Sequence, residues 1–212
     1  MAKSRARIEL INAVDDMNNK IKADALQCGG YYRSRAKVLL DTASVFSVEL
    51  SVDAYCGGSY PVTDIGAVVF DAVTGDRYSP LSLYEVGRQE DVDERVTWRY
   101  EIRDRLEAAL LSDARTARDG GDCLSAIRSD KAQEFGLGAV DESRVALGRD
   151  GLHVYPEPSH VVQSCYRTIV LRYASLRPYL NEAEAARISW TEPLTTGPRL
   201  PRRARGADFT CG

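Results

Sequence analysis

The residues SVFSVELSVDAY (44–55) and CGGSYP (56–61) decide the fold of this chain. Apolar and polar side chains alternate along the first stretch, which is the period of a half-buried β-strand. Gly57-Gly58 then bends the chain. A second strand is expected over residues 65–70, and FDAVTGD (70–76) predicts a hairpin toward residues 78–84, since Gly75 is free to adopt positive φ.

The residues before this stretch predict a helix and one more strand. Residues 5–27 carry apolar side chains at roughly helical spacing with charged side chains between them, which predicts an amphipathic helix. Residues 36–40 predict a strand that leads through Asp41-Thr42 into residues 44–55. The first half is therefore expected to be a helix followed by an antiparallel meander.

The middle of the chain predicts helices. Apolar residues recur every three or four positions over residues 98–118, and we expect Gly120-Gly121 to end that helix. A short helix near residues 129–135 would follow it.

The end of the chain predicts strands again. The Asp-Gly pair of GRDG (148–151) indicates a hairpin between residues 144–147 and 152–155. Residues 166–173 predict a last strand, and residues 175–180 predict a helical turn capped by Ser175. Together these elements predict an α+β fold, an antiparallel β-sheet of meander and hairpins with two or three helices packed on it.

Length, composition and charge bound the class of protein. The chain has 212 residues, of which 44% are hydrophobic and 28% charged, as in a soluble globular protein. We expect a single α+β domain over residues 1–190 and a disordered tail rich in proline and arginine over residues 191–212. No apolar run approaches the ~20 residues of a membrane-spanning helix. The net charge of -3 disfavours a general nucleic-acid binder.

Five cysteines are many for a chain of this size. None lies in a Cys-x-x-Cys pair or a zinc-type cluster, so we expect no metal and no cofactor. Buried free thiols and two disulfides with one cysteine left over are both compatible with the pattern. We favour disulfides, because Cys28 and Cys56 each stand beside Gly-Gly at an expected turn.

Disulfides imply an oxidising, extracytoplasmic compartment. The first residues are basic, but no apolar stretch follows them, so no signal peptide is visible. Either a leader was removed and a starting Met added, or export is the wrong inference.

Several residues suggest catalytic or metal chemistry, but each has a structural explanation that we prefer. His160 and Cys165 could form a Cys-His dyad, yet no oxyanion-type glycine motif surrounds Cys165. Asp71 and Asp76 lack the ligand spacing of a calcium loop, so a hairpin turn explains them better. We therefore expect no catalytic residues, and predict that the protein is not an enzyme.

Tyrosines suggest a binding surface. A tyrosine side chain offers a large contact area at low entropic cost, although half or more of them should belong to the core or the sheet faces. Gly57-Gly58 could also expose backbone donors, although a simple bend is the more common role of such a pair. We predict ligand binding around Tyr55, Gly57, Gly58 and Tyr60.

The arrangement resembles the extracytoplasmic domain of lysozyme-sensing anti-sigma factors, which also occurs beside peptidoglycan deacetylase modules. The resemblance runs from about residue 8 to residue 180. The residues that carry it are Ile11-Asn12, the Gly57-Gly58 bend with Pro61, the Phe70-Asp71-x-x-Thr74-Gly75 hairpin, and Asp150-Gly151-Leu152 with Tyr155.

The chain departs from that family at the bend. Ser59 and Tyr60 stand where the family usually has Ala and His, so a role for that histidine does not transfer. The cytoplasmic segment and membrane span of an anti-sigma factor are not found in this sequence, so sigma-factor regulation does not transfer either.

The resemblance implies a secreted or envelope-anchored binding domain of the bacterial cell envelope, with a lysozyme-type hydrolase or a cell-wall glycan as partner. Alternatives are a cell-wall hydrolase accessory or enzyme, and an intracellular structural protein with reduced cysteines.

We predict the disulfides Cys28–Cys56 and Cys123–Cys165, one in each half of the chain, with Cys211 free. Protein purified without reductant should then show one free thiol, and each disulfide loop should contribute about 3 to 4 kcal/mol by the chain-entropy model. Non-reducing peptide mapping checks the pairing. Five free thiols, or Cys211 joined to another cysteine, would contradict it.

Overall fold

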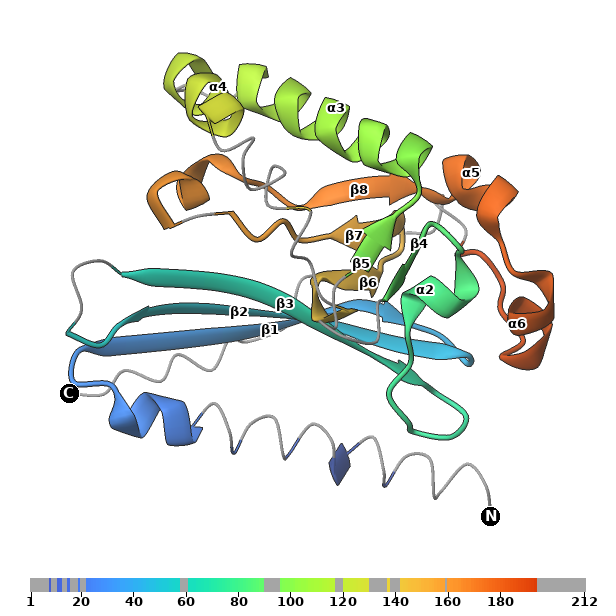
Figure 1. The fold of residues 1–212 in the computed structure, drawn as a ribbon. Coiled ribbons are helices and arrows are strands. Elements are labelled where there is room, and N and C mark those ends of the chain that lie inside the picture. Colours follow the sequence, from blue (N-terminus) through green and yellow to red (C-terminus); the bar gives the residue numbers. More distant parts are fainter. Residues whose placement is uncertain are drawn as a thin grey trace. The chain divides into compact units, whose positions relative to one another are not determined.

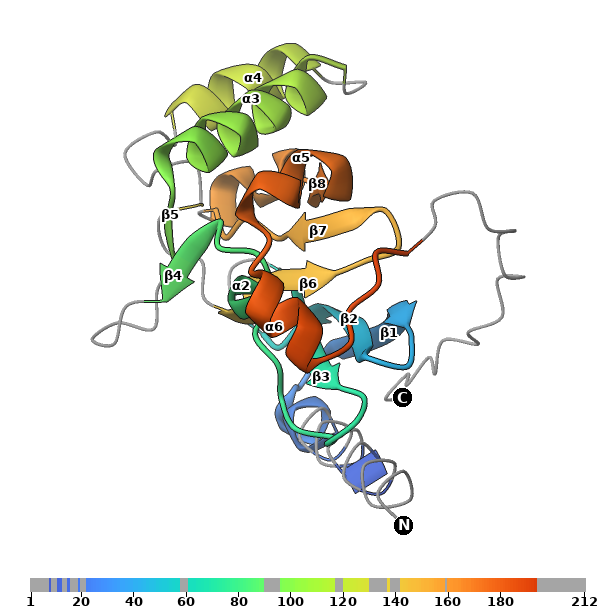
Figure 2. The same cartoon turned by 90° about the vertical axis from the view of Figure 1, so that its right-hand side faces the viewer.

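A computed structural model describes residues 8, 11–12, 15, 19, 22–57, 61–89, 96–116, 120–129, 137, 142–158 and 160–193. The chain forms two compact units, Met1–Tyr78 with Ala186–Gly212, and Ser79–Ala185. Helices and antiparallel sheets make up both, so the expected α+β class is confirmed (Figures 1 and 2). The single domain and the disordered tail stay predictions, and residues 194–212 lie outside the described residues.

The first unit is built on a three-stranded meander. Its strands are β1 (Tyr31–Asp41), β2 (Val45–Tyr55) and β3 (Val62–Asp71), in the order β1-β2-β3 with both pairs antiparallel (Figure 1). β2 confirms the expected alternating strand. β1 and β3 are longer than expected, because pairing with β2 extends them over polar residues that their own sequences do not mark as strand.

The segment before β1 is helical at residues 22–27, as expected. The side chain that this helix packs against the sheet is not one of the large apolar residues expected to form its buried face. Leu26 is 83% exposed, and Ala25 instead packs in a small buried cluster with Tyr32 and Ala54. A small residue suits this position, because Tyr32 fills the space between the helix and the strands.

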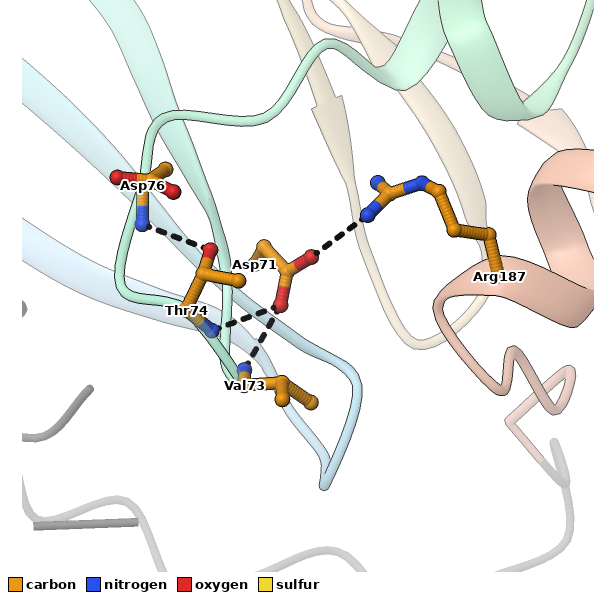
Figure 3. A network of polar contacts seen from close by, with 5 residues as sticks. All are labelled: Asp71, Val73, Thr74, Asp76 and Arg187. Carbon is orange, nitrogen blue, oxygen red and sulfur yellow. Dashed lines mark hydrogen bonds and ion pairs between the residues drawn. The ribbon is translucent and has the colours of Figure 1, made fainter. Parts of the chain in front are cut away.

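A side-chain network holds the turn after β3 (Figure 3). One oxygen of the buried Asp71 carboxylate accepts hydrogen bonds from the backbone N–H of Val73 at 2.8 Å and of Thr74 at 3.1 Å. Its other oxygen lies 3.3 Å from Nη1 of Arg187. Gly75 has a φ of 84°, which few other residues adopt. Asp71 is therefore part of a hairpin turn, as the sequence indicated.

The expected strand over residues 78–84 is wrong. Only Arg77 bridges back to Phe70, and the chain then forms the short helix α2 (Pro80–Leu83). Ser79 caps this helix by accepting a hydrogen bond from the N–H of Leu81, and Pro80 occupies its first turn. Proline fits there because the first helical N–H groups have no partner within the helix.

The second unit contains a three-stranded sheet and two packed helices. The sheet consists of β6 (Val145–Leu147), β7 (Gly151–Val154) and β8 (Ile169–Arg172), so the hairpin around Asp150-Gly151 is confirmed. Figure 2 shows α3 (Tyr100–Thr116) and α4 (Gly120–Ser129) lying side by side.

Two expectations about these helices are wrong. Trp98 belongs to a two-stranded pair, β4 (Gly87–Gln89) with β5 (Val96–Trp98), which the sequence did not predict. Gly120-Gly121 begins α4 instead of ending the preceding helix. Glycine is tolerated in the first turn, where its backbone freedom costs less than in a helix interior. The region of the helix expected near 129–135 lies outside the described residues from 130 onward.

The last part of the second unit is more helical than expected. β8 is shorter than the predicted strand, because Tyr173 already starts α5 (Tyr173–Leu176). The 3₁₀ helices η2 (Glu142–Arg144), η3 (His160–Cys165) and η4 (Arg177–Tyr179) and the helix α6 (Glu182–Arg187) complete the described elements. Ser175 is no N-cap: its hydroxyl donates to the carbonyl of Arg172 at 2.7 Å.

Both expected disulfides are formed. Cys28 is bonded to Cys56 in the first unit, and Cys123 on α4 is bonded to Cys165 in the second. Among the described helices, none is long and apolar enough to cross a membrane.

The network at Asp71 predicts a large effect on stability. Asp71→Ala should lower the free energy of unfolding by about 1 to 3 kcal/mol, because two backbone donors lose their acceptor. Asp76→Ala is the matched control, since the exposed Asp76 enters the network through its backbone N–H and not through its carboxylate. Urea unfolding monitored by circular dichroism measures both. Equal stabilities would show that Asp71 does not hold the turn.

Candidate functional site

The tyrosines of the described residues divide clearly by exposure. Six of them lie in the cores of the two units: Tyr32, Tyr78, Tyr84, Tyr155, Tyr166 and Tyr173. Tyr31 and Tyr55 differ, since they remain 39% and 38% exposed on the first sheet. An exposed pair of aromatic rings is a candidate contact surface, because such rings offer large apolar area next to a polar hydroxyl.

The antiparallel register brings these two tyrosines together. Tyr31 starts β1, Tyr55 ends β2, and they stand directly opposite each other. Their rings are stacked, with centroids 6.4 Å apart and planes inclined by 30°. The Cys28–Cys56 disulfide joins the same two chain segments immediately beyond the tyrosines.

Glycines allow the backbone to close around this point. A Cβ on Gly30 would lie 2.0 Å from the carbonyl oxygen of Tyr55, so a side chain is excluded there. Gly57 has a φ of 89°, which favours glycine, and its surroundings are open. The bend is therefore fixed by backbone geometry and a covalent bond, while the tyrosine rings stay accessible.

Charged groups complete the surface. The guanidinium carbon of Arg33 lies 5.5 Å from the centre of the Tyr31 ring, within the range of a cation–π interaction. The hydroxyl of Tyr31 donates a hydrogen bond to Oδ1 of Asp53 at 3.2 Å. We call Tyr31, Arg33, Asp53, Tyr55 and Gly57 the tyrosine surface.

The environment of Tyr31 favours its neutral form. Desolvation raises the pKa of Tyr31 above its ordinary value of 10.0, as do the negative charge of Asp53 and the hydrogen bond to it, while Arg33 lowers it. Tyr31 therefore keeps its proton at neutral pH and acts as a hydrogen-bond donor. The tyrosine surface is suited to binding through ring faces, donors and charge.

The structure places part of the predicted site. Tyr55 and Gly57 lie on the tyrosine surface, whereas Gly58 and Tyr60 lie outside the described residues. The site predicted from the sequence did not include Tyr31, Arg33 and Asp53. The expected disulfide could have pointed to them. A bond between Cys28 and Cys56 brings the start of β1 and the end of β2 side by side, and these two ends carry the missed residues.

Cys165, which suggested a catalytic dyad, and the buried His153 both have structural partners. Cys165 has no free thiol, because it is bonded to Cys123, and a Cys-His dyad with His160 is therefore excluded. Nε2 of the buried His153 lies 2.7 Å from Oδ1 of Asp150. The histidine ring also covers Gly148, where a Cβ would approach Nε2 to 2.2 Å. His153 thus holds the β6–β7 turn.

Within the described residues, no group of three or more His, Cys, Asp and Glu side chains is placed to hold a metal ion.

Comparisons with known proteins give a distant structural similarity. Two solved structures of DUF3298 family proteins are similar to the chain. The one from Pseudomonas aeruginosa PAO1 has 16% sequence identity and a TM-score of 0.40, covering 72% of this chain and 63% of that one. The one from Bacteroides fragilis NCTC 9343 has 14% identity and a TM-score of 0.43, covering 82% and 64%.

The chain thus spans less than two thirds of the length of either structure. No protein-family model matches the sequence, and no curated protein matches it.

The raised pKa of Tyr31 predicts a titration shift. Asp53→Asn should lower the pKa of Tyr31, because the negative charge that stabilises the neutral phenol is removed. Since the folded-state pKa is raised, the stability that Tyr31 contributes is present below pH 10 and is lost as the pH rises through that pKa. In the variant the loss should begin at the same pH, which the unfolded chain sets, but should be smaller and end at a lower pH.

NMR titration of 13C-labelled tyrosine, with Tyr31→Phe to assign the signal, measures this shift. Glu49→Gln is the control, because Glu49 pairs with Lys37 farther along the same strands. A Tyr31 titration that is the same in Asp53→Asn as in the unchanged protein would show that Asp53 does not act on this phenol.

Proposed function

We propose that the chain is an extracytoplasmic, non-catalytic binding domain that recognises its partner through the tyrosine surface. One observation carries the proposal: Tyr31 and Tyr55 form an exposed stacked pair beside a disulfide-fixed bend. A rigid bend lowers the entropic cost of binding, because the contact residues are already ordered before the partner arrives.

The two disulfides support the compartment. Disulfides form and persist in oxidising surroundings and are rare in the reducing cytosol. Cys28–Cys56 and Cys123–Cys165 lie in different units of the chain, so each unit has its own covalent link. This favours the secreted or envelope-anchored setting over an intracellular structural protein with reduced thiols.

The resemblance to the extracytoplasmic domain of lysozyme-sensing anti-sigma factors suggests two kinds of partner. One is a lysozyme-type hydrolase, and the other is a fragment of the cell wall. The tyrosine surface suits either partner, since aromatic side chains are enriched where proteins bind their partners.

The alternative of a hydrolase or hydrolase accessory has less support. Asp71 and Cys165, which suggested metal or catalytic chemistry, are engaged in structural bonds, and so is the buried His153. Asp71 is bonded to a turn and to Arg187, His153 to Asp150, and Cys165 to Cys123. Cys165 in particular has no thiol to act as a nucleophile while it is bonded to Cys123.

The proposal predicts binding without turnover. The chain should be retained by insoluble cell-wall sacculi or by an immobilised lysozyme-type hydrolase, and Tyr55→Ala should weaken that capture roughly tenfold, as loss of an aromatic anchor does. The melting temperature should hardly change, because Tyr55 is exposed. Co-sedimentation with sacculi and retention on the immobilised hydrolase measure the binding of the unchanged chain and of Tyr55→Ala.

Tyr100→Ala is the matched control, since Tyr100 is an exposed tyrosine on α3 in the other unit. Capture of neither ligand would contradict the proposed function. Steady release of soluble wall fragments by the pure chain would show that it is an enzyme instead.

A further inference from the structure

A row of cations extends the tyrosine surface along β1. Residues 31, 33, 35 and 37 share one face of the strand, since side chains alternate with a period of two, and all four are exposed. Their partners on β2 are Tyr55, Asp53, Ser51 and Glu49. Three of the four β1 side chains, Arg33, Arg35 and Lys37, are positively charged.

Among the described residues, two of these three cationic side chains form no ion pair. Lys37 is paired, with Nζ 3.6 Å from Oε1 of Glu49. Asp53, which faces Arg33 across the strands, instead accepts the hydrogen bond of Tyr31. Arg33 lies over the Tyr31 ring, and Arg35 faces Ser51. In the described parts of the chain, neither arginine has a carboxylate partner.

We infer that the ligand of the tyrosine surface is an anionic polysaccharide that carries carboxylates, with Arg33 and Arg35 as its electrostatic contacts. This inference rests on the proposed function, since it names the partner class of the same surface. Arg33 and Arg35 occupy consecutive positions on one face of the strand, so their Cα atoms lie about 7 Å apart. A guanidinium binds a carboxylate through paired hydrogen bonds, which an ammonium group does not reproduce.

The aromatic rings favour a sugar polymer over other anions. The face of the Tyr55 ring carries partial negative charge and attracts the polarised C–H groups of a sugar ring packed against it, while Arg33 already lies over the Tyr31 ring. A surface that offers ring faces and guanidinium groups side by side matches a chain that alternates apolar C–H faces with carboxylates.

The charge of the whole chain argues for a local site. The net charge is -3 and the isoelectric point is about 5.5, so the chain as a whole does not attract polyanions. A nucleic-acid binder would need a basic domain, which this is not. A strongly basic protein partner would meet two unpaired arginines here and be repelled.

The test uses the full oxidised chain and three probes: oligogalacturonate, its fully methyl-esterified form, and polyglutamate. We expect oligogalacturonate to bind, the neutral ester to bind roughly tenfold more weakly, and polyglutamate to bind no better than the ester. Binding of oligogalacturonate should weaken as sodium chloride rises, because exposed charges are screened over about 10 Å at 0.1 M salt. Isothermal titration calorimetry measures all three.

Substitutions separate the arginines from the rest of the surface. The double variant Arg33→Gln/Arg35→Gln should lose roughly tenfold in affinity for oligogalacturonate, the size expected for two exposed ion pairs, and keep the weak binding of the ester. Arg35→Lys should fall between the double variant and the unchanged protein. Arg149→Gln is the control, because Arg149 is an exposed arginine in the β6–β7 turn of the other unit.

Several results would overturn the inference. Equal affinity for the acid and the ester would show that charge plays no part, and tight binding of polyglutamate would indicate an acidic protein partner. An unchanged affinity of the double variant together with self-association would show that the arginines only protect an edge strand from pairing.

The outcome also separates this inference from the proposed function. Capture of sacculi that depends on Tyr55, without binding of oligogalacturonate, would refute only the anionic polysaccharide. If sacculi, hydrolase and oligosaccharides are all left unbound, both conclusions fail.

Discussion

The register between β1 and β2 is the constraint on which the first unit depends. A slip by one residue would move every side chain of β1 to the other face of the sheet, so Tyr31 would lose Tyr55 and its core neighbour Tyr32 would meet water. The hairpin is closed at both ends. Thr42 exchanges hydrogen bonds with Val45 at the turn, and the Cys28–Cys56 bond joins the open end, where antiparallel strands otherwise fray.

A second constraint joins Arg187 and Ser189 to the same sheet. The hydroxyl of Ser44 donates to the carbonyl oxygen of Ser189 at 2.7 Å, across 145 positions of sequence. Asp71 contacts Arg187, whose guanidinium also lies 5.9 Å from the centre of the Tyr78 ring. Arg187, at the end of α6, and Ser189 thus belong to the first unit although the second unit separates them from its sheet in sequence. A buried carboxylate suits this place, because backbone donors and a cation together offset the cost of its desolvation.

The same physical reasoning separates structural residues from candidate binding residues. Asp71, His153 and Cys165 have the chemistry that active sites use, yet each is engaged by a turn, a neighbouring side chain or a disulfide. Tyr31 and Tyr55 have ordinary chemistry but keep more than a third of their surface exposed on a rigid support. Single exposed apolar side chains are common on protein surfaces, but two exposed rings stacked side by side are informative about binding.

The sequence by itself determined the elements whose signals are local. The alternation of residues 44–55 predicted β2, Asp150-Gly151 predicted the β6–β7 hairpin, and the cysteines beside turns suggested their pairing. Tertiary structure decided what depends on distant partners. Gly120-Gly121 begins a helix because that helix has neighbours to pack on, and Arg33 meets Tyr31 and Asp53 only through strand pairing. Cross-strand neighbours are set by register, and register is a property of two segments together, which neither sequence segment contains alone.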